Sequence, residues 1–327
     1  MNHPLVCIVV LNWNALKETI ECMDSLQKIR YPQYKLIIVD NASSNNEAHI
    51  FRQMYSEVAD IILAKENYGY TGGNNIGMEY AIENYNPDFI LILNNDIIVD
   101  PDFLNHLIKV AQSDPKIGIV GGKVYYHKYP DLIQSAGIGL NMYTGKSYHI
   151  GYMKFDKGQY DYQRIVNIVM GCCMLIKREV IDKIGLLDEQ YFCYKDDIDY
   201  CYKCSKAGYD VVYTPLAKIW HKNYVKLKIW ERTQSKNKRS AFTQYLLARN
   251  NFMFMKKHAN RLQRISFFIY FFTLHFIFQT GVCLIFHRDF KRYLAMCRGA
   301  LDGIKYFFIS TPGRCLINRK KYISITK

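Results

Sequence analysis

Residues 5–14 have the sequence LVCIVVLNWN, in which seven apolar residues are followed by the polar Asn12 and Asn14. An unbroken apolar run of this length is typical of a strand buried on both faces of a parallel sheet. Three further runs follow and end near polar residues, at 35–39, 60–64 and 88–93. Segments with helical spacing of apolar residues lie between or after them, at 15–29, 46–58, 74–85 and 101–112. This alternation predicts an α/β fold around a mostly parallel sheet.

Polar side chains stand near the carboxyl ends of the four predicted strands: Asn12, Asp40, Asn67 and Asp96. In parallel sheets these ends meet at one edge, where ligands bind, so we expect the four residues to share one site. A glycine-rich loop at 69–73 precedes a predicted helix and would let the backbone approach a nucleotide. It matches neither a P-loop nor a dinucleotide-binding fingerprint.

Two acidic motifs and one histidine each have two interpretations. Asn94-Asn95-Asp96 fits a Mg²⁺ or Mn²⁺ site completed by phosphate oxygens, although Asp96 could simply cap the turn before Pro101. Asp196-Asp197-Ile198-Asp199 offers a general base, although acids in the first turn of a helix also favour its dipole. His221 follows a predicted strand and is either a metal ligand or a structural histidine.

The chain beyond residue 122 is less regular. Residues 123–165 lack periodicity and are predicted to form an irregular excursion over the sheet. Strands are expected at 165–170, 172–176 and 209–213, and helices at 178–184 and 200–207. The lone Cys201-x-x-Cys204 pair cannot fill a four-ligand zinc site, so we expect two helix thiols with one facing inward.

Charge divides the 327-residue chain into two parts. Half of the residues are apolar and 22% are charged, which suits a packed globular protein. Residues 1–221 carry 21 Lys and Arg against 26 Asp and Glu, whereas residues 222–327 carry 22 against 3. We therefore predict a domain at 1–221 and a basic, aromatic-rich helical region at 222–327. Such a region suits nucleic acid or an anionic membrane surface.

Short motifs in a fixed order give the sequence a resemblance to a known family. They lie at 8–14, 38–43, 67–69, 72–77, 93–96, 171–173, 187–189, 194–199 and 249–250. Over roughly residues 5–255 the chain resembles the family 2 glycosyltransferases, in the branch often called rhamnosyltransferase-like. The resemblance implies a GT-A fold, with a nucleotide-sugar half at about 1–120 and an acceptor half at about 121–221.

The resemblance also implies roles for single residues. Asp40 matches the aspartate that contacts the nucleotide base, and Asp96 matches the last residue of a DXD-type metal motif. Asp197 matches the catalytic base of a Glu-Asp motif, in which Asp196 replaces the Glu. His221 matches a metal or diphosphate contact. Further contacts with nucleotide or substrate are implied for Asn12, Asn67, Gly73, Asn74, Asn95 and Asp199.

These matches imply an inverting transferase that depends on Mg²⁺ or Mn²⁺. Its donor would be dTDP-rhamnose or a UDP-sugar, and its acceptor a saccharide or lipid-linked saccharide in cell-surface polysaccharide synthesis. The alternatives are a nucleic-acid-binding protein that uses the basic third, and a non-catalytic scaffold that binds sugar nucleotides. No helix-turn-helix, zinc-finger or RRM signature supports the first, so no nucleic-acid partner is expected. No oligomeric state is predicted.

An apolar segment at 265–286 lies inside the basic region. Its 22 residues include no charged side chain, and Lys and Arg residues flank it on both sides. The length suffices to span a bilayer. Polar residues near its centre, such as His275 and Gln279, favour an interfacial or re-entrant helix over a span or a buried core helix. We therefore expect a cytoplasmic protein, peripheral on or anchored to the inner face of the cell membrane.

Overall fold

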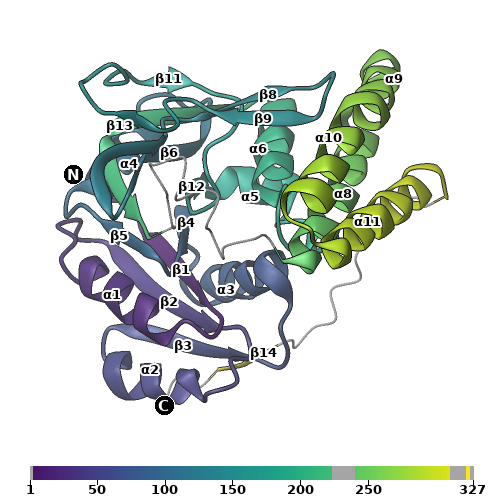
Figure 1. Ribbon diagram of the computed structural model, residues 1–327. Coiled ribbons are helices and arrows are strands. Elements are labelled where there is room, and N and C mark those ends of the chain that lie inside the picture. Colours follow the sequence, from purple (N-terminus) through teal and green to yellow (C-terminus); the bar gives the residue numbers. More distant parts are fainter. Residues whose placement is uncertain (1–2, 223–239, 310–321, 325–327) are drawn as a thin grey trace.

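The computed structural model describes residues 3–222, 240–309 and 322–324 (Figure 1). The strands are β1 (Val6–Asn12), β2 (Tyr34–Asp40), β3 (Ala59–Ala64), β4 (Phe89–Asn94), β5 (Ile97–Val99), β6 (Ile117–Tyr126), β7 (Tyr129–Ser135), β8 (Ile138–Asn141), β9 (Lys146–His149), β10 (Lys154–Phe155), β11 (Arg164–Ile165), β12 (Cys173–Lys177), β13 (Asp210–His221) and β14 (Tyr322–Ser324). The helices are α1 (Leu16–Leu26), α2 (Glu47–Tyr55), α3 (Gly69–Tyr85), α4 (Phe103–Ala111), α5 (Arg178–Ile184), α6 (Asp196–Lys206), α8 (Ala241–His258), α9 (Arg261–Tyr270), α10 (Phe276–Gly281) and α11 (Phe290–Ile309).

The main sheet has the parallel centre that the sequence predicts. β3, β2, β1 and β4 lie side by side in that order and run parallel, with Asn12 of β1 opposite Asp40 of β2. β12 then pairs antiparallel with both β4 and β6, so the sheet is mixed beyond this point. The chain places β2 and β3 on one side of β1 and then crosses to β4 on the other side. A ligand crevice forms at such a switch point.

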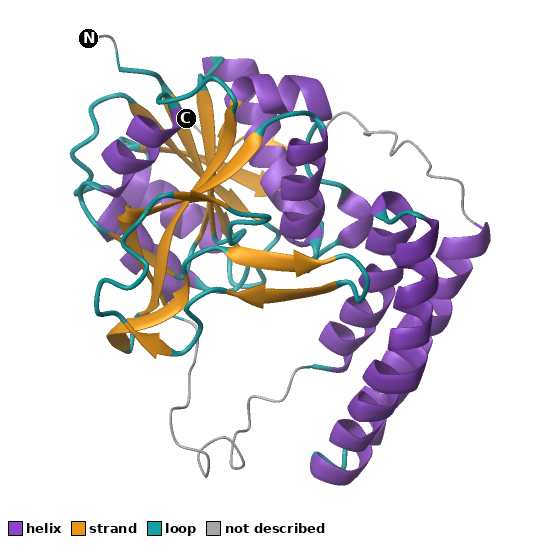
Figure 2. Cartoon of the chain, turned by 90° about the horizontal axis from the view of Figure 1, so that it is seen from above, coloured by secondary structure: helices purple, strands orange, loops and turns teal. Residues whose placement is uncertain are grey.

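Helices cover both faces of this sheet, which explains the unbroken apolar strands (Figure 2). Successive side chains of a strand point to opposite faces. Val6, Ile8 and Val10 belong to the core that includes side chains of α1, α2 and α4. Cys7 and Val9 belong to the second core, which includes side chains of α3, α5 and α6. All five strand residues are fully buried.

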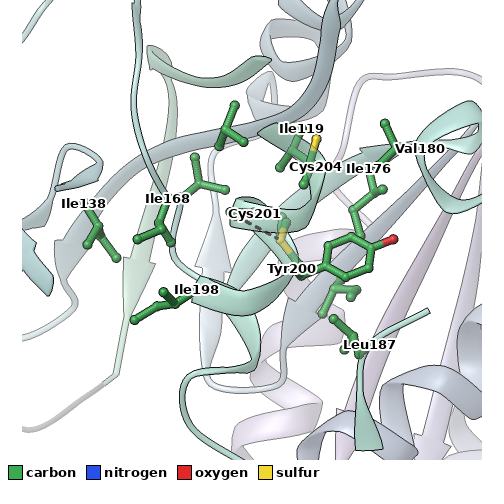
Figure 3. Packing of buried hydrophobic residues seen from close by; sticks show 14 of the residues in the cluster. Ile119, Ile138, Ile168, Ile176, Val180, Leu187, Ile198, Tyr200, Cys201 and Cys204 are labelled. Atoms are coloured by element: carbon green, nitrogen blue, oxygen red, sulfur yellow. Dashed lines mark hydrogen bonds between the residues drawn. The ribbon is translucent and has the colours of Figure 1, made fainter. Parts of the chain in front are cut away.

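The second core also contains both thiols of the Cys-x-x-Cys pair on α6 (Figure 3). The sequence predicted only one of them to face inward, but Cys201 and Cys204 are both free and fully buried. Cys201 lies 3.9 Å from the sulfur of Met174 on β12. Cys204 lies against Gly118 of β6, where a Cβ atom would come within 2.9 Å of its sulfur. Helix α6 therefore packs against both β12 and β6.

Helix α3 begins earlier than predicted, at Gly69, and includes most of the glycine-rich segment assigned to a loop. Glycine is a poor helix former, but here it allows two elements to approach closely. A Cβ atom at Gly73 would lie 2.5 Å from a methyl carbon of Leu11, and one at Gly77 would lie 2.3 Å from Val9. Packing of α3 onto β1 thus outweighs the local propensity.

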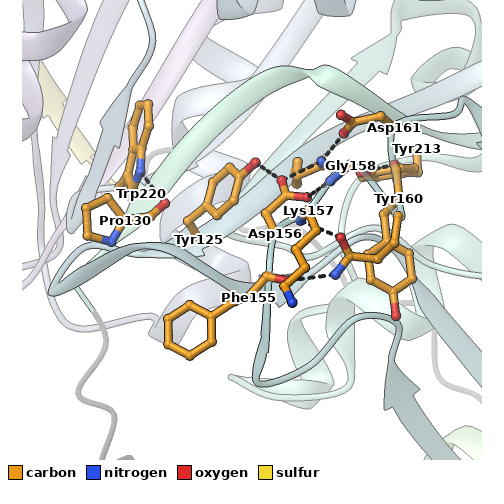
Figure 4. Close-up of polar contacts among 12 residues, drawn as sticks. Tyr125, Pro130, Phe155, Asp156, Lys157, Gly158, Tyr160, Asp161, Tyr213 and Trp220 are labelled. Carbon is orange, nitrogen blue, oxygen red and sulfur yellow. Dashed lines mark hydrogen bonds and ion pairs between the residues drawn. The ribbon is translucent and has the colours of Figure 1, made fainter.

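Residues 123–165 are largely strands rather than the irregular excursion that we predicted. β6 extends into this segment, and β7 to β11 follow. Its anchor is Lys123, whose side chain is fully buried and lies 2.7 Å from Asp156 while also contacting Asp161. The Tyr125 hydroxyl donates to Asp156 as well (Figure 4). Periodicity missed these strands because most of them are short and because ion pairs to the buried Lys123, as well as apolar contacts, hold them.

Three other boundaries differ from prediction. α6 begins earlier than expected, at Asp196, so all three acids of its motif lie in the first turn. The strand expected at 165–170 is reduced to β11 and one isolated bridge at Ile168. β13 is longer than expected and ends at His221, which lies within the strand opposite Ile97 of β5.

The C-terminal helices form a group beside the end of the β8–β9 hairpin (Figures 1 and 2). α8 and α11 pack closely, since a Cβ atom at Gly299 would lie 2.2 Å from the carbonyl oxygen of Tyr245. α9, α10 and π-helical turns at Phe271–His275 and Val282–Phe286 make one continuous helix, Arg261–Phe286. It is long and apolar enough to cross a membrane, and only 11% of its most apolar stretch is buried. That exposure argues against a core helix.

Candidate active site

A polar network joins the carboxyl ends of β1 and β2 to the turn after β4. The side-chain nitrogen of Asn12 donates to Oδ1 of Asp40 at 3.1 Å and to Glu47 at 2.8 Å. The Thr19 hydroxyl donates to Oδ1 of Asn12, and Asn95 donates to the Thr19 hydroxyl, both at 2.8 Å. Asn12 is fully buried and positions its neighbours.

Asp40 keeps one oxygen unpaired in this network. Its Oδ1 accepts from Asn12 and from the backbone N–H of Ser43 at 3.2 Å. Its Oδ2 is buried and has no hydrogen-bond partner. A buried carboxylate oxygen without a partner is costly. An N–H or O–H group of a ligand that reached Oδ2 would remove that cost.

Asn41 holds the segment that leads into α3. Its nitrogen donates to Oδ1 of Asn67 at 3.0 Å and to the Gly69 carbonyl at 2.9 Å, and its Oδ1 accepts from the Tyr68 N–H at 3.0 Å. Asn67, predicted as a ligand contact, therefore also shapes the backbone. Asn41 lies within one of the sequence motifs, but its role could not be predicted, because its partners lie about 26 residues away.

Asp96 and His221 form a pair at the end of the crevice. Nε2 of His221 lies 3.1 Å from Oδ2 of Asp96, and Nδ1 lies 2.9 Å from Oε1 of Gln134. Since an amide oxygen only accepts, Nδ1 donates to Gln134. Nε2 then faces Asp96 either as a second N–H donor or, without a proton, as a lone pair that could share a cation with the carboxylate. Burial raises the pKa of Asp96, but the hydrogen bond and charge of His221 outweigh burial and lower that pKa overall.

The side chains at this place suit a divalent cation. Oδ1 of Asp96 is buried without a hydrogen-bond partner, and imidazole nitrogen and carboxylate oxygen both bind Mn²⁺. Within the described parts of the chain, no group of three or more His, Cys, Asp or Glu residues could hold a metal. A cation bound by Asp96 and His221 would therefore take its remaining ligands from water and phosphate oxygens.

The first two acids of α6 lie in different surroundings. Asp196 is buried, and burial together with the charge of Asp197 raises its pKa well above the ordinary value. Asp197 is half-buried, and its carboxylate accepts from the N–H groups of Gly171 at 3.3 Å and Ile198 at 2.8 Å. Burial raises the pKa of Asp197 too, although these two N–H groups oppose the shift. The greater exposure of Asp197 makes it the better placed of the two to meet a substrate.

Cys172 lies close to both acidic motifs, the one at Asp96 and the one at Asp197. The pKa of its thiol is raised well above the ordinary value by burial, by Cys173 and then by the charges of Asp96 and Asp197. Both carboxylates therefore act on one buried side chain. The Cys172 carbonyl also accepts from the backbone N–H of Asn94 at 3.0 Å. The backbone thus brings the end of β4, which precedes Asp96, next to the segment whose Gly171 N–H donates to Asp197.

A cavity of about 470 Å³ opens beside these residues. Its walls come from the strand ends, the loop at 192–194 and the first turns of α8, and include Leu11, Asn41, Asn67, Asn95, Phe242 and Leu246. Trp13 also lines it and is 55% exposed, which offers a flat apolar surface that the sequence analysis did not assign. Tyr70 connects the cavity to Asp197, because its hydroxyl donates to the carbonyl of Gly171 at 2.7 Å.

Asp199 has contacts other than the predicted substrate. Its Oδ1 accepts from the Tyr191 hydroxyl at 2.9 Å and lies 2.7 Å from Nε2 of His258 on α8. Burial opposes ionisation of Asp199, but His258 and the charge of Lys257 outweigh it and lower the pKa. Because the Asp199 side chain is only 2% exposed, it serves to join α6 to α8.

Helix α8 also fixes the loop that leads into α6. The side-chain nitrogen of Asn250 lies 2.9–3.1 Å from the carbonyl oxygens of Tyr191, Cys193 and Tyr194. Arg249 donates to the Tyr191 carbonyl at 3.0 Å. Asn250 is fully buried. The Arg249-Asn250 motif therefore holds this loop in place through hydrogen bonds to its backbone carbonyls.

The structure gathers most of the predicted site residues at one edge of the sheet. In α3, Gly73 packs on β1, and Asn74 donates to the Tyr70 carbonyl at 2.8 Å while its own Oδ1 is buried without a hydrogen-bond partner. The predicted residues in this region are Asn12, Asp40, Asn67, Gly73, Asn74, Asn95, Asp96, Asp196, Asp197 and His221. Asp199 is the exception, because its carboxylate pairs with His258 of helix α8.

Residues 3–243 match the model of the family "Glycosyltransferase like family 2". The match covers most of the chain, so the chain belongs to this family. It confirms the resemblance inferred from the strand-end motifs.

Two relatives illustrate the range of the family. An uncharacterized protein, y4gI, of Sinorhizobium fredii is 32% identical over 67% of this chain, which spans only 24% of that protein. The low-salt glycan biosynthesis hexosyltransferase Agl10 of Haloferax volcanii is 25% identical, and the similarity covers 83% of each chain.

Solved structures confirm the GT-A fold. A mannosyltransferase from Pyrobaculum calidifontis, solved with GDP-Man and Mn²⁺, superimposes with a TM-score of 0.56 at 14% identity and covers 93% of this chain and 88% of its own. TarS of S. aureus, solved as residues 1–349 with UDP-GlcNAc, gives a TM-score of 0.58 at 13% identity and covers 92% and 81%.

Proposed function

We propose that this protein is an inverting, metal-dependent glycosyltransferase in cell-surface polysaccharide synthesis. It takes a sugar from dTDP-rhamnose or a UDP-sugar and transfers it to a saccharide or a lipid-linked saccharide. Family membership supports a glycosyltransferase that uses nucleotide sugars. The observation that carries the finer proposal is a pair of buried carboxylate oxygens without partners, Oδ2 of Asp40 and Oδ1 of Asp96, at one edge of the sheet.

Each of these oxygens has a counterpart in a nucleotide sugar. Oδ2 of Asp40 would accept from an N–H of the base, and the cavity walls offer Trp13 and Leu11 for apolar contact. Asp96 and His221 would hold Mn²⁺ or Mg²⁺, which when bound neutralises the charge that develops on the leaving diphosphate. The mannosyltransferase solved with GDP-Man and Mn²⁺ has this fold, which supports the combination.

Asp197 is the proposed general base. It takes the proton of an acceptor hydroxyl while the hydroxyl oxygen forms a bond to the anomeric carbon. On the opposite face the bond from that carbon to the diphosphate oxygen breaks, and the nucleoside diphosphate leaves with the electron pair. The anomeric configuration is thereby inverted. A pKa raised by burial makes Asp197 a stronger base once it is ionised.

The C-terminal helices would attach the enzyme to the cytoplasmic membrane surface. Large apolar side chains point outward from helix Arg261–Phe286 and from α11: Leu262, Ile265, Ile269, Leu274, Ile277, Phe278, Ile285, Phe286, Phe290, Leu294, Leu301, Phe308 and Ile309. An exposed apolar face of this extent is typical of an interaction surface. Exposed Arg261, Arg288 and Lys291 lie beside it and suit anionic head groups.

A donor screen tests the proposal. The full chain is incubated with UDP-, GDP- and dTDP-sugars, with Mn²⁺ or with EDTA, while thermal unfolding and release of nucleoside diphosphate are measured. We expect one nucleotide class to raise the Tm and to be turned over only with Mn²⁺. Stabilisation without turnover in the presence of glycan and lipid-linked acceptors would instead favour a sugar-nucleotide-binding scaffold.

A further inference from the structure

A second cavity, of about 250 Å³, lies where the β8–β9 hairpin meets the C-terminal helices. Its polar lining includes Lys146, Lys195, Gln244, Asn251, His275 and Gln279. The tip of the hairpin lies against the helices, because a Cβ atom at Gly145 would come within 3.3 Å of the Met255 sulfur and 3.4 Å of the Phe267 ring. The cavity therefore joins the acceptor half of the sheet domain to the apolar helix.

The lining of this cavity is cationic. It includes the two lysines Lys146 and Lys195, and among the described residues no Asp or Glu contributes to it. Nζ of Lys195 donates to the Gly145 carbonyl at 2.6 Å and lies 5.6 Å from the centre of the Phe254 ring, and its remaining N–H groups can meet a further acceptor. Burial lowers the pKa of Lys195 to about 8, although the charge of Asp197 opposes the shift. A bound anion would stabilise an ammonium group placed in this way.

The cavity is also close to the proposed base. Lys195 and Asp197 are two residues apart, so their Cα atoms are at most about 7.6 Å apart. Each affects the pKa of the other. An anion bound by Lys195 would therefore lie in the neighbourhood of the proposed base.

One helix forms part of the cavity and part of the exposed apolar face. His275 and Gln279 are four residues apart on one side of it and line the cavity. Leu274, Ile277 and Phe278 of the same helix are 63–66% exposed. This arrangement explains the polar residues at the centre of an apolar segment. It also places an anion site next to a surface suited to an acyl or prenyl chain.

We propose that this cavity binds the phosphate or diphosphate through which the acceptor is attached to a lipid. The lipid chain then runs along the exposed apolar side of helix Arg261–Phe286, and the reacting hydroxyl belongs to a sugar close to the phosphate. The inference rests on the proposed function, because it assigns the acceptor class to the same catalytic site.

Calorimetry with the full chain in EDTA tests this inference. The probes are decyl diphosphate below its micelle concentration, inorganic diphosphate, and uncharged octyl glucoside. We expect decyl diphosphate to bind at least tenfold more tightly than either of the others. Lys195→Gln and Lys146→Gln should each weaken its binding at least tenfold, and Lys157→Gln, an exposed lysine outside the cavity, should leave it unchanged.

Three results would overturn the inference. They are unchanged binding of decyl diphosphate in both cavity variants, equal binding of octyl glucoside, and equal binding of inorganic diphosphate, which would point to a soluble phosphate ligand. Lys146 is exposed, so its substitution remains informative if Lys195→Gln does not fold. Nucleotide binding with Mn²⁺ is measured on the same proteins. Its absence in the wild type would contradict the proposed function, whereas its retention in the lysine variants separates the acceptor site from the donor site.

Discussion

Nε2 of His221 lies 3.1 Å from Oδ2 of Asp96, although the two residues are 125 positions apart in the sequence. The antiparallel pairing of β13 with β5 brings them together, since His221 is opposite Ile97, the residue after Asp96. The last residue of a long strand thus supplies an imidazole to the acid that follows β4. This contact turns two separate sequence signals into one potential metal site.

Asp96→Asn should suppress metal-dependent turnover, because an amide oxygen is a weaker ligand for a divalent cation than a carboxylate. We expect kcat/KM to fall by roughly 10²–10³-fold, the size of effect typical for loss of charge stabilisation in a transition state. Steady-state rates over a Mn²⁺ titration measure the change. Asp131→Asn replaces an exposed acid of β7 and should behave as the wild type. A wild-type response of Asp96→Asn to Mn²⁺ would exclude the metal role.

Asp196 should reduce the stability of the folded chain at neutral pH. Burial and Asp197 raise its pKa well above the ordinary value, so the folded state retains a proton that the unfolded state loses near pH 4. The free energy of unfolding therefore falls as the pH rises from about 4 toward the raised pKa. Asp196→Asn should raise the Tm near pH 7.5 and change it little at pH 4. An equal gain at both pH values, or a gain in the exposed control Asp24→Asn, would refute this explanation.

Asn250→Ala should lower kcat by more than it weakens nucleotide binding, because the loop that Asn250 holds leads to the proposed base and also forms one wall of the cavity. The substitution leaves the carbonyl groups of Tyr191, Cys193 and Tyr194 without this donor, at a cost of about 1–3 kcal/mol in stability. The loop that leads to the proposed base would then lose its fixed position. Turnover and calorimetric nucleotide binding are compared with those of Asn105→Ala on α4. Loss of both activities in equal measure would indicate general unfolding instead of mispositioning.

Membrane attachment should depend more on the apolar face than on charge. Lys257 pairs with Asp188, Arg292 is buried, and Lys256 and Arg264 bond to backbone carbonyls. Of the Lys and Arg residues that flank segment 265–286, the three exposed ones, Arg261, Arg288 and Lys291, supply only about 3 kcal/mol at an anionic surface.

Flotation with anionic liposomes tests this balance. We expect high salt to release only part of the protein. Ile277→Asp with Ile285→Asp should reduce flotation strongly while leaving the Tm close to wild type, because both side chains are mostly exposed. Leu216→Asp, on β13 and 56% exposed, is the matched control. Complete release by salt would show that charge dominates.

The central fold could be predicted because its determinants are local. Each buried parallel strand is a short apolar run, and a polar residue near its end marks the ligand edge of the sheet. This reasoning located Asn12, Asp40 and Asp96, and the structure places all three at that edge.

The remaining features depend on partners distant in sequence. The strands in residues 123–165 are held by buried Lys123 and its two acids, which no periodicity reveals. The partner of Asp199 is His258, 59 residues away on α8. Asp199 was therefore grouped with Asp197 from their proximity in one motif, whereas the fold gives the two acids different surroundings.

Turnover by Asp197→Asn tests the central claim most directly. The variant and the matched control Asp182→Asn are supplied with the donor found by the screen, Mn²⁺ and a lipid-linked acceptor, and nucleoside diphosphate release is followed as a function of pH. In the wild type the rate should fall as the pH drops through the raised pKa of Asp197, since only the ionised carboxylate accepts a proton. Asp197→Asn should bind the nucleotide normally, lose about 10²–10⁴-fold in kcat and lose this pH dependence. A variant that retains wild-type kcat would contradict the assignment of Asp197 as the base.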